Sequence, residues 1–400
     1  MVKEKNLIAV VIVLSIFAIV SPPMLWRVPL LATFFGYMRK LAFLAALYLV
    51  YRESFYRERY FVAYIGFFAF LLVVSYIVNN AYGRSWDNFY MNFSMAVFIL
   101  YGMKKYPRYL ISLLAVMLTV WIGLNTVTWK EGGAYLTDNG QYGFFLGTKT
   151  SVTQYQVAAF FFVDLLRMSI KEKNRFVADI LLTTNVLSIV IYYILQPIST
   201  SVVCLAIYLC FHLLTRWLSL LKRNVLNIAF WGIIILNFSI VVLNIQNLFE
   251  NFIVNVLRED LTLNNRTFIW RVVLLKCSDS PVIGHGFDSD ITFSINEYTS
   301  YNQSTHNQLL SWLFLGGIIG FIFIMFLIAW ALHTSNKKGR TTCSAIIGIT
   351  FLELSFLWIS EQFNTYVLFT AIMMVCFNYD KLIPLETPKR KFKFLTKGRI

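Results

Sequence analysis

The longest polar interval of this chain, residues 246–306, contains the side chains best suited to chemistry. It includes Arg266, the turn Gly284-His285-Gly286 and, at its end, His306. A guanidinium binds phosphate oxygens in a bidentate fashion, and an imidazole is the side chain most often used as a general base near neutral pH. If the protein catalyses a reaction, we expect the reaction to take place here.

Arg266 is expected at the start of a short helix, for which Asn264, Asn265 or Thr267 can provide the N-cap. Free backbone N–H groups of a first helical turn, together with a guanidinium, hold phosphate or diphosphate well. Arg271 lies about 140° round the same helix, so both arginines reach one ligand only if that ligand is large or the helix is broken. The alternative is a surface amphipathic helix whose arginines contact lipid headgroups.

His306 is expected in the first turn of the next apolar helix, with Ser304 or Thr305 as the cap. The positive end of a helix disfavours the imidazolium, so the imidazole is expected to be neutral, as a general base must be. Asn307 beside it can orient either the imidazole or a sugar hydroxyl. The alternative is a histidine that merely accompanies the cap.

The glycines of the turn Gly284-His285-Gly286 are weak evidence for phosphate binding, because the turn neither follows a strand nor opens a clear helix. They are better explained by a close approach of the loop to the rest of the protein, which glycine permits.

Composition identifies the elements that carry these residues. The 400-residue chain is 58% hydrophobic and only 14% charged, about half the charged share of an ordinary soluble domain. Apolar runs long enough to cross a bilayer recur along its whole length, which predicts an all-α integral membrane protein with a single domain, residues 1–400.

The formal charge of +15 does not indicate nucleic-acid binding, because the basic residues form short clusters between apolar runs, as the positive-inside rule requires. The cysteines are scattered without metal-binding spacing, so we expect no metal site and no disulfide.

We expect about twelve transmembrane helices, with both termini in the cytoplasm and residues 246–306 as a long extracytoplasmic loop before the tenth helix. The predicted spans are 6–20, 34–50, 61–78, 89–102, 109–126, 151–170, 176–195, 199–220, 225–245, 307–332 and two short helices within 341–377.

Arg39 and Lys40 are the exception to this charge pattern, because they fall within the second predicted span. Ionisable side chains at such depth are costly and should face a cavity or a partner. Alternatively, both side chains reach the outer interface because the span starts later.

Taken together, the motifs of the polar interval resemble those of the O-antigen ligase and polymerase family of polytopic membrane glycosyltransferases. That family has a helix with the pattern S/N-G/N-R-x-x-x-W, a G-x-G-[FY] turn and an H-N pair at the next helix start, in this order. The corresponding residues here are Asn265-Arg266 with Trp270, residues 284–287, and His306-Asn307 followed by the glycines of 316–320.

The resemblance implies a GT-C-like helical fold in the cytoplasmic membrane of a bacterium, an undecaprenyl-diphosphate-linked glycan donor, and transfer to a sugar hydroxyl without metal or other cofactor. Arg266 would bind the donor diphosphate, His306 would activate or position the acceptor hydroxyl, and Lys149 would be a second phosphate contact. Flippase and chain-length regulator proteins would be the protein partners. The other candidate substrate-binding residues are Arg39, Trp270, Arg271 and Asn307.

One departure from the family pattern bears on the type of reaction. Many ligases have a Ser/Thr-Arg pair at the outer start of the eighth span, where this chain has Ser199-Thr200-Ser201. We therefore expect a polymerase of capsular or O-antigen repeat units, with an O-antigen ligase as the alternative. A lipid-linked oligosaccharide flippase is a different class, and it would place its charges along the membrane midplane rather than in one outer loop.

Overall fold

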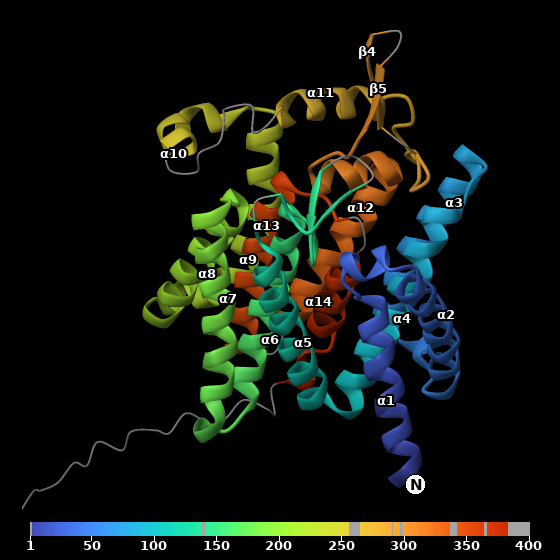
Figure 1. Cartoon of the computed structure of the whole chain (residues 1–400), viewed down its shortest axis with the longest axis vertical. Coiled ribbons are helices and arrows are strands. Elements are labelled where there is room, and N and C mark those ends of the chain that lie inside the picture. Colours follow the sequence, from blue (N-terminus) through green and yellow to red (C-terminus); the bar gives the residue numbers. More distant parts are fainter. Residues whose placement is uncertain are drawn as a thin grey trace, which may run out of the picture.

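The computed structural model describes residues 2–130, 132–137, 141–255, 265–289, 291–296, 299–336, 342–363 and 366–382. Long helices run side by side and form a bundle, and one end of the bundle is crossed by helix α11 and carries short strands (Figure 1). The α-helices are α1 (Val2–Ile19), α2 (Pro29–Arg52), α3 (Arg59–Asn79), α4 (Gly83–Lys105), α5 (Pro107–Thr128), α6 (Val152–Ser169), α7 (Arg175–Leu195), α8 (Ser199–Trp217), α9 (Ser219–Val241), α10 (Glu250–Asn255), α11 (Arg266–Cys277), α12 (Gln308–Asn336), α13 (Thr342–Ser360) and α14 (Val367–Phe377).

The strands belong to two small antiparallel sheets. One sheet joins β1 (Tyr135–Leu136), β2 (Tyr142–Phe144) and β3 (Gly147–Thr148), and the other pairs β4 (Ile291–Asn296) with β5 (Thr299–Gln303). The 3₁₀ helix η3 (Lys149–Ser151) connects β3 directly to α6. These strands were not predicted from the sequence. The strands β1, β2 and β3 are too short to show an alternating pattern, whereas the strict alternation of apolar and polar residues in β4 was an available signal.

Each predicted span coincides with a helix, and the fold is mainly helical as expected. Within the described residues, seven helices are long and apolar enough to cross a membrane, and they lie in α2, α3, α5, α7, α9, α12 and α13. The count of twelve spans, the GT-C-like arrangement and the sidedness of the termini stay predictions.

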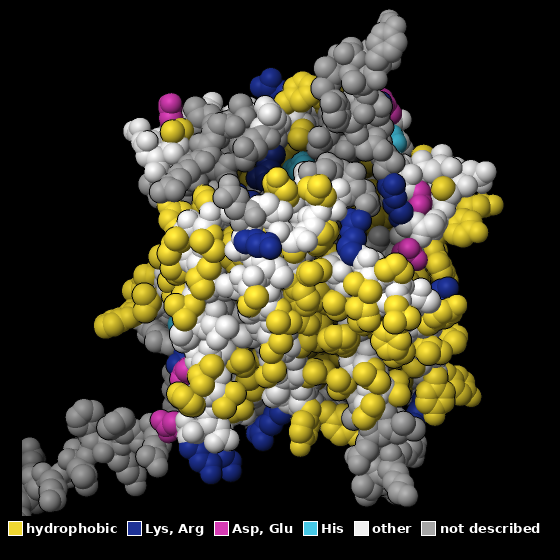
Figure 2. Space-filling model, viewed as in Figure 1, with side chains coloured by type: hydrophobic (Ala, Val, Ile, Leu, Met, Phe, Trp, Pro, Cys, Tyr) yellow, Lys and Arg dark blue, Asp and Glu magenta, His cyan; other side chains and the backbone are white. Residues whose placement is uncertain are grey.

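Helices α4, α6, α13 and α14 form the centre of the bundle. Most side chains of these four helices are buried, whereas large apolar side chains of α2, α5 and α7 are exposed, including Leu30, Val127 and Ile194. Figure 2 shows hydrophobic side chains across the middle of the bundle surface. An apolar belt around an apolar centre is what a protein surrounded by lipid presents.

Helix α12 is broken in its first half. Gly317 has φ 58° and ψ −163°, values that only glycine adopts readily. In a continuous helix the carbonyls of Phe314 and Leu315 would accept hydrogen bonds from the amides of Ile318 and Ile319. Here those four groups pair with residues 281–286: His285 N donates to Phe314 O (2.8 Å), Gly286 N to Leu315 O (2.8 Å), Ile318 N to Pro281 O (2.9 Å) and Ile319 N to Val282 O (3.2 Å).

The same turn, residues 281–289, also docks on α3 and α4. Ser75 Oγ accepts a hydrogen bond from Phe287 N (2.7 Å), and Asn79 donates to the carbonyl of His285 (2.6 Å). Asp288 accepts hydrogen bonds from Arg84 N (2.8 Å) and Ser85 Oγ (2.7 Å) in the first turn of α4, where a carboxylate is favoured by the helix dipole. The expectation that the glycines let this loop approach the rest of the protein is confirmed.

We predict that Gly317→Ala destabilises the protein, because an added Cβ would lie 2.4 Å from the carbonyl carbon of Val282. Backbone strain alone costs about 1–3 kcal/mol. The matched control is Gly123→Ala in α5, where a Cβ meets nothing within 4 Å. Thermal unfolding in detergent should show a lower midpoint for the Gly317 variant only, and equal midpoints would contradict this account of the helix break.

Candidate functional site

Helix α11 begins at Arg266, as the sequence predicts, but it is not capped in the expected way. Asn265 precedes the helix in the left-handed conformation (φ 63°) and makes no side-chain capping bond. Ile269, Trp270 and Val273 form the buried face of the helix. Arg266 is thereby held at the helix start against the bundle, with its side chain only 15% exposed.

Arg266 forms an ion pair with Glu361, the residue that follows α13. Its Nη2 atom lies 2.9 Å from Glu361 Oε1, and the Glu361 side chain is 12% exposed. Burial raises the pKa of the Glu361 carboxyl, while the charge of Arg266 and the hydroxyl of Thr150 oppose that rise. The guanidinium is therefore neutralised by one nearby carboxylate in the absence of a ligand.

His306 lies next to this pair. Burial, together with the positive charge of Arg266, lowers the pKa of its imidazole to about 4. The predicted neutral imidazole is thus supported, although by burial and Arg266 rather than by a helix dipole. Among the described residues, none hydrogen-bonds to this ring.

The cap of α12 differs from the prediction. His306 is not in the first turn but precedes the helix in the left-handed conformation (φ 45°), and Asn307 is the cap, because its Oδ1 accepts a hydrogen bond from Leu310 N at 2.9 Å. Asparagine is among the strongest N-cap residues. Thr305 instead bonds to Gln362, its amide donating to Oε1 at 2.9 Å, which ties the start of α12 to the segment after α13.

Asn307 also joins α12 to two neighbouring helices. Its Nδ2 donates to Asn237 Oδ1 in α9 (3.0 Å) and to the carbonyl of Ile359 in α13 (3.3 Å), and the side chain is fully buried. Because all its polar atoms are engaged in this way, a substrate-binding role would require one of these bonds to break.

Lys149 lies in η3, directly before Thr150, whose hydroxyl acts on Glu361. It pairs with no carboxylate among the described residues. The fold thus brings Arg266 and His306 together near Glu361, and it places Lys149 next in sequence to Thr150, which interacts with the same carboxylate. We call Lys149, Arg266, His306 and Glu361 the cationic centre.

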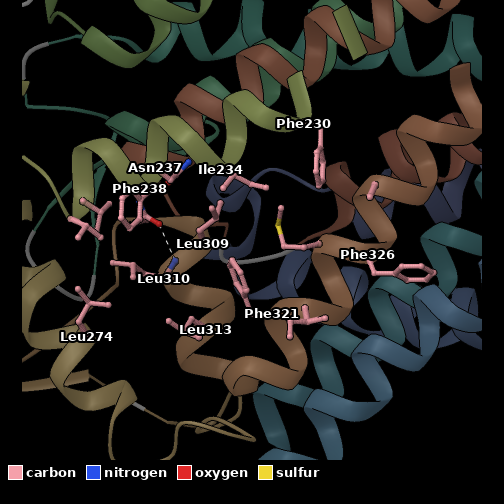
Figure 3. Close-up of a pocket in the computed structure, with 16 residues that line it drawn as sticks. Phe230, Ile234, Asn237, Phe238, Leu274, Leu309, Leu310, Leu313, Phe321 and Phe326 are labelled. Carbon is pink, nitrogen blue, oxygen red and sulfur yellow. Dashed lines mark hydrogen bonds between the residues drawn. The ribbon is translucent and has the colours of Figure 1, made fainter. Parts of the chain in front are cut away.

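An apolar groove of about 590 Å³ lies between α9 and α12, and Asn307, the residue next to His306 in sequence, is part of its lining. Figure 3 shows Phe238 of α9, Leu313 and Phe326 of α12, and Leu274 of α11 on its walls. Its only polar lining residues are Asn237 and Asn307, whose mutual hydrogen bond is dashed in the figure. Phe238 and Phe326 are more than half exposed, so the groove opens on the side of the bundle.

The other predicted substrate-binding residues lie in different surroundings. Trp270 is 1% exposed and packs in the core, and Arg271 is exposed on the opposite side of α11. Arg39 lines a second cavity and bonds to the last carbonyls of α1, which favours the cavity-facing alternative. Lys40 is exposed.

Residues 180–325 match the family model described as O-antigen ligase. The match supports the O-antigen ligase and polymerase family. It includes Arg266, His306 and most residues that line the apolar groove, and it agrees with the family resemblance read from the motifs. No curated protein matches the chain.

Two members of the site lie outside the region matched to the O-antigen ligase family, and one of them escaped sequence reasoning. Lys149 was predicted from the resemblance. Glu361 lies within the block 341–377, which was predicted only to form two short helices. It is one of two acidic residues in that otherwise apolar block, with Glu353, and nothing in the sequence pairs it with Arg266.

We predict that Arg266→Ala both abolishes transfer and destabilises the protein, since it leaves the largely buried Glu361 without its partner. Breaking such a pair costs up to about 3–5 kcal/mol. The double variant Arg266→Ala/Glu361→Gln should regain thermal stability and yield without regaining activity. Activity in the stable double variant would show that Arg266 serves only the fold.

We predict that kcat/KM stays constant from pH 8 to about pH 5 and falls as the pH approaches 4, because protonation removes the base form of His306. His306→Gln should lower transfer roughly a hundredfold to ten-thousandfold and remove that acid limb. The control is His333→Gln at the far end of α12, which should leave rate and profile unchanged. A retained acid limb in His306→Gln would assign it to another group.

Proposed function

We propose that the protein is a polymerase that joins undecaprenyl-diphosphate-linked repeat units into capsular or O-antigen polysaccharide on the outer side of the cytoplasmic membrane. The observation that carries this proposal is a side-opening apolar groove lined by Asn307, which directly follows His306 of the cationic centre. A donor that consists of a polyprenyl chain, a diphosphate and a glycan needs these two environments in contact.

In this proposal the donor diphosphate displaces Glu361 from Arg266. A guanidinium binds two phosphate oxygens at once, as it does a carboxylate, so the exchange preserves the geometry of Arg266. Lys149 adds a second positive charge. The isoprenoid chain lies in the apolar groove, which keeps it in apolar surroundings as the lipid bilayer does.

The transfer step then requires one base and one leaving-group stabiliser. A hydroxyl of the acceptor sugar attacks the anomeric carbon of the donor glycan and gives its proton to His306. The bond between the anomeric carbon and the diphosphate oxygen breaks, and its electron pair leaves with undecaprenyl diphosphate. Arg266 and Lys149 stabilise the charge that develops on that oxygen.

Donor binding also improves the base. The charge of Arg266 contributes to the low pKa of His306, and a bound diphosphate offsets that charge. The imidazole therefore becomes more basic when the donor is in place. His306 is thus most basic when the donor is bound and the transfer can take place.

The test uses purified protein with undecaprenyl-diphosphate repeat units as the sole substrate. A polymerase yields a ladder of products on the same lipid, whereas a ligase yields none until another acceptor is supplied. Synthesis in detergent, where no membrane separates two compartments, also excludes a flippase as the source. Absence of a ladder with active donor would overturn the proposal, and the His306→Gln variant provides the background level.

A further inference from the structure

A second cavity, of about 550 Å³, lies near the end of α1. Its wall comes from the segment after α1, from α2, from the hairpin β1–β3 and from the start of α6, and this hairpin lies toward the end of the bundle crossed by α11 (Figure 1). Unlike the apolar groove, it presents cationic and hydroxyl groups. Those used below are Ser21, Arg39, Tyr135, Thr148 and Tyr155.

Arg39 is fixed in this cavity by neutral partners. Its Nε donates to the carbonyl of Ala18 (3.0 Å), and its Nη2 donates to the carbonyl of Ile19 and to Ser21 Oγ (both 3.3 Å). The guanidinium carbon lies 4.0 Å from the ring centroid of Trp26. These contacts set the orientation of the side chain without neutralising its charge.

The charge of Arg39 remains available to a ligand. Within the described part of the chain, no carboxylate lies within ion-pair distance of it and no acceptor bonds to Nη1; Asp87 acts on the guanidinium only from a longer distance. An arginine within an apolar bundle is costly unless its charge is compensated. The unmet charge and the cavity in front of it together indicate an anionic ligand.

The rest of the wall offers hydroxyl groups. Thr148 and Tyr155 supply hydroxyls that both donate and accept hydrogen bonds, whereas Ser21 Oγ is already hydrogen-bonded to Ala18, Trp26 and Arg39. The Tyr135 ring is covered by the Arg27 guanidinium, 5.3 Å from the centroid, so the hydroxyls of Thr148 and Tyr155 are what complements a sugar.

The cavity adjoins the cationic centre. Thr148 and Ser151 line it, and they flank Lys149 and Thr150, which belong to or contact that centre. The apolar groove is lined by Asn307, beside His306, whereas this cavity borders η3, which carries Lys149. The groove and the cavity therefore lie next to different members of the cationic centre.

We propose that this cavity binds the acceptor glycan through an anionic group of its terminal sugars, a carboxylate or a phosphate, held by Arg39. The identification of this ligand as the acceptor rests on the proposed function. The binding of a sugar anion in the cavity does not depend on that function. The assignment places the acceptor hydroxyl on the η3 side of the cationic centre and the donor on the groove side.

The test monitors Trp26 in protein labelled with 5-fluorotryptophan, its ¹⁹F resonance being assigned with Trp26→Phe. Glucuronic acid or glucose 1-phosphate should shift this resonance saturably, while neutral glucose should not. Arg39→Gln should weaken the binding at least about tenfold, the loss expected for one charge-assisted hydrogen bond. Lys40→Gln, the exposed neighbour, should bind as the wild type does.

Several outcomes would overturn the assignment. These are no shift with either sugar anion, an equal shift in Arg39→Gln, or a shift with inorganic pyrophosphate alone, which would identify a carrier-diphosphate site instead. Folding of Arg39→Gln is checked by thermal unfolding, and Arg39→Lys, which keeps the charge, should bind with intermediate strength. If the protein binds the sugar anions but makes no ladder of products, the binding site in this cavity is supported and the proposed polymerase function is contradicted.

Discussion

The break in α12 at Gly317 is the constraint on which the site depends. Four backbone groups leave the helical ladder there, and each would cost several kcal/mol if it were left unpaired away from water. Residues 281–286 satisfy all four. Helix α11, which begins at Arg266, comes just before this turn, and His306 comes just before α12. The hydrogen bonds between the turn and α12 therefore hold both residues in position.

Charge compensation is the second constraint. Arg266 and Glu361 are both largely buried, so neither is stable there without an opposite charge. The pair compensates the charge of Arg266, so a stray anion that binds less well than a carboxylate does not displace Glu361. Only a ligand with comparable bidentate geometry and additional contacts competes with it, which favours a diphosphate anchored by a long apolar chain.

The sequence predicted what depends on neighbouring residues. Apolar runs gave the helices, Arg266 was placed correctly at a helix start, and the glycines of 284–286 were correctly linked to a close approach of the loop. Asn307 was missed as the cap because Ser304 and Thr305 were equally plausible by local rules. Glu361 was missed because its partner Arg266 is distant in sequence. The orientation of the Arg39 side chain could not be predicted, because its hydrogen-bond acceptors, the carbonyls of Ala18 and Ile19, lie in another helix.

If the groove between α9 and α12 holds a carrier lipid, as proposed, its open side determines how that lipid enters and leaves. A lipid-linked donor would then enter and leave by lateral diffusion in the bilayer, and its isoprenoid would never cross water. The spent carrier can then depart while the glycan stays engaged on the other side of the cationic centre. Product length would thus be decided by a competition between lateral diffusion of the carrier and the retention of the glycan.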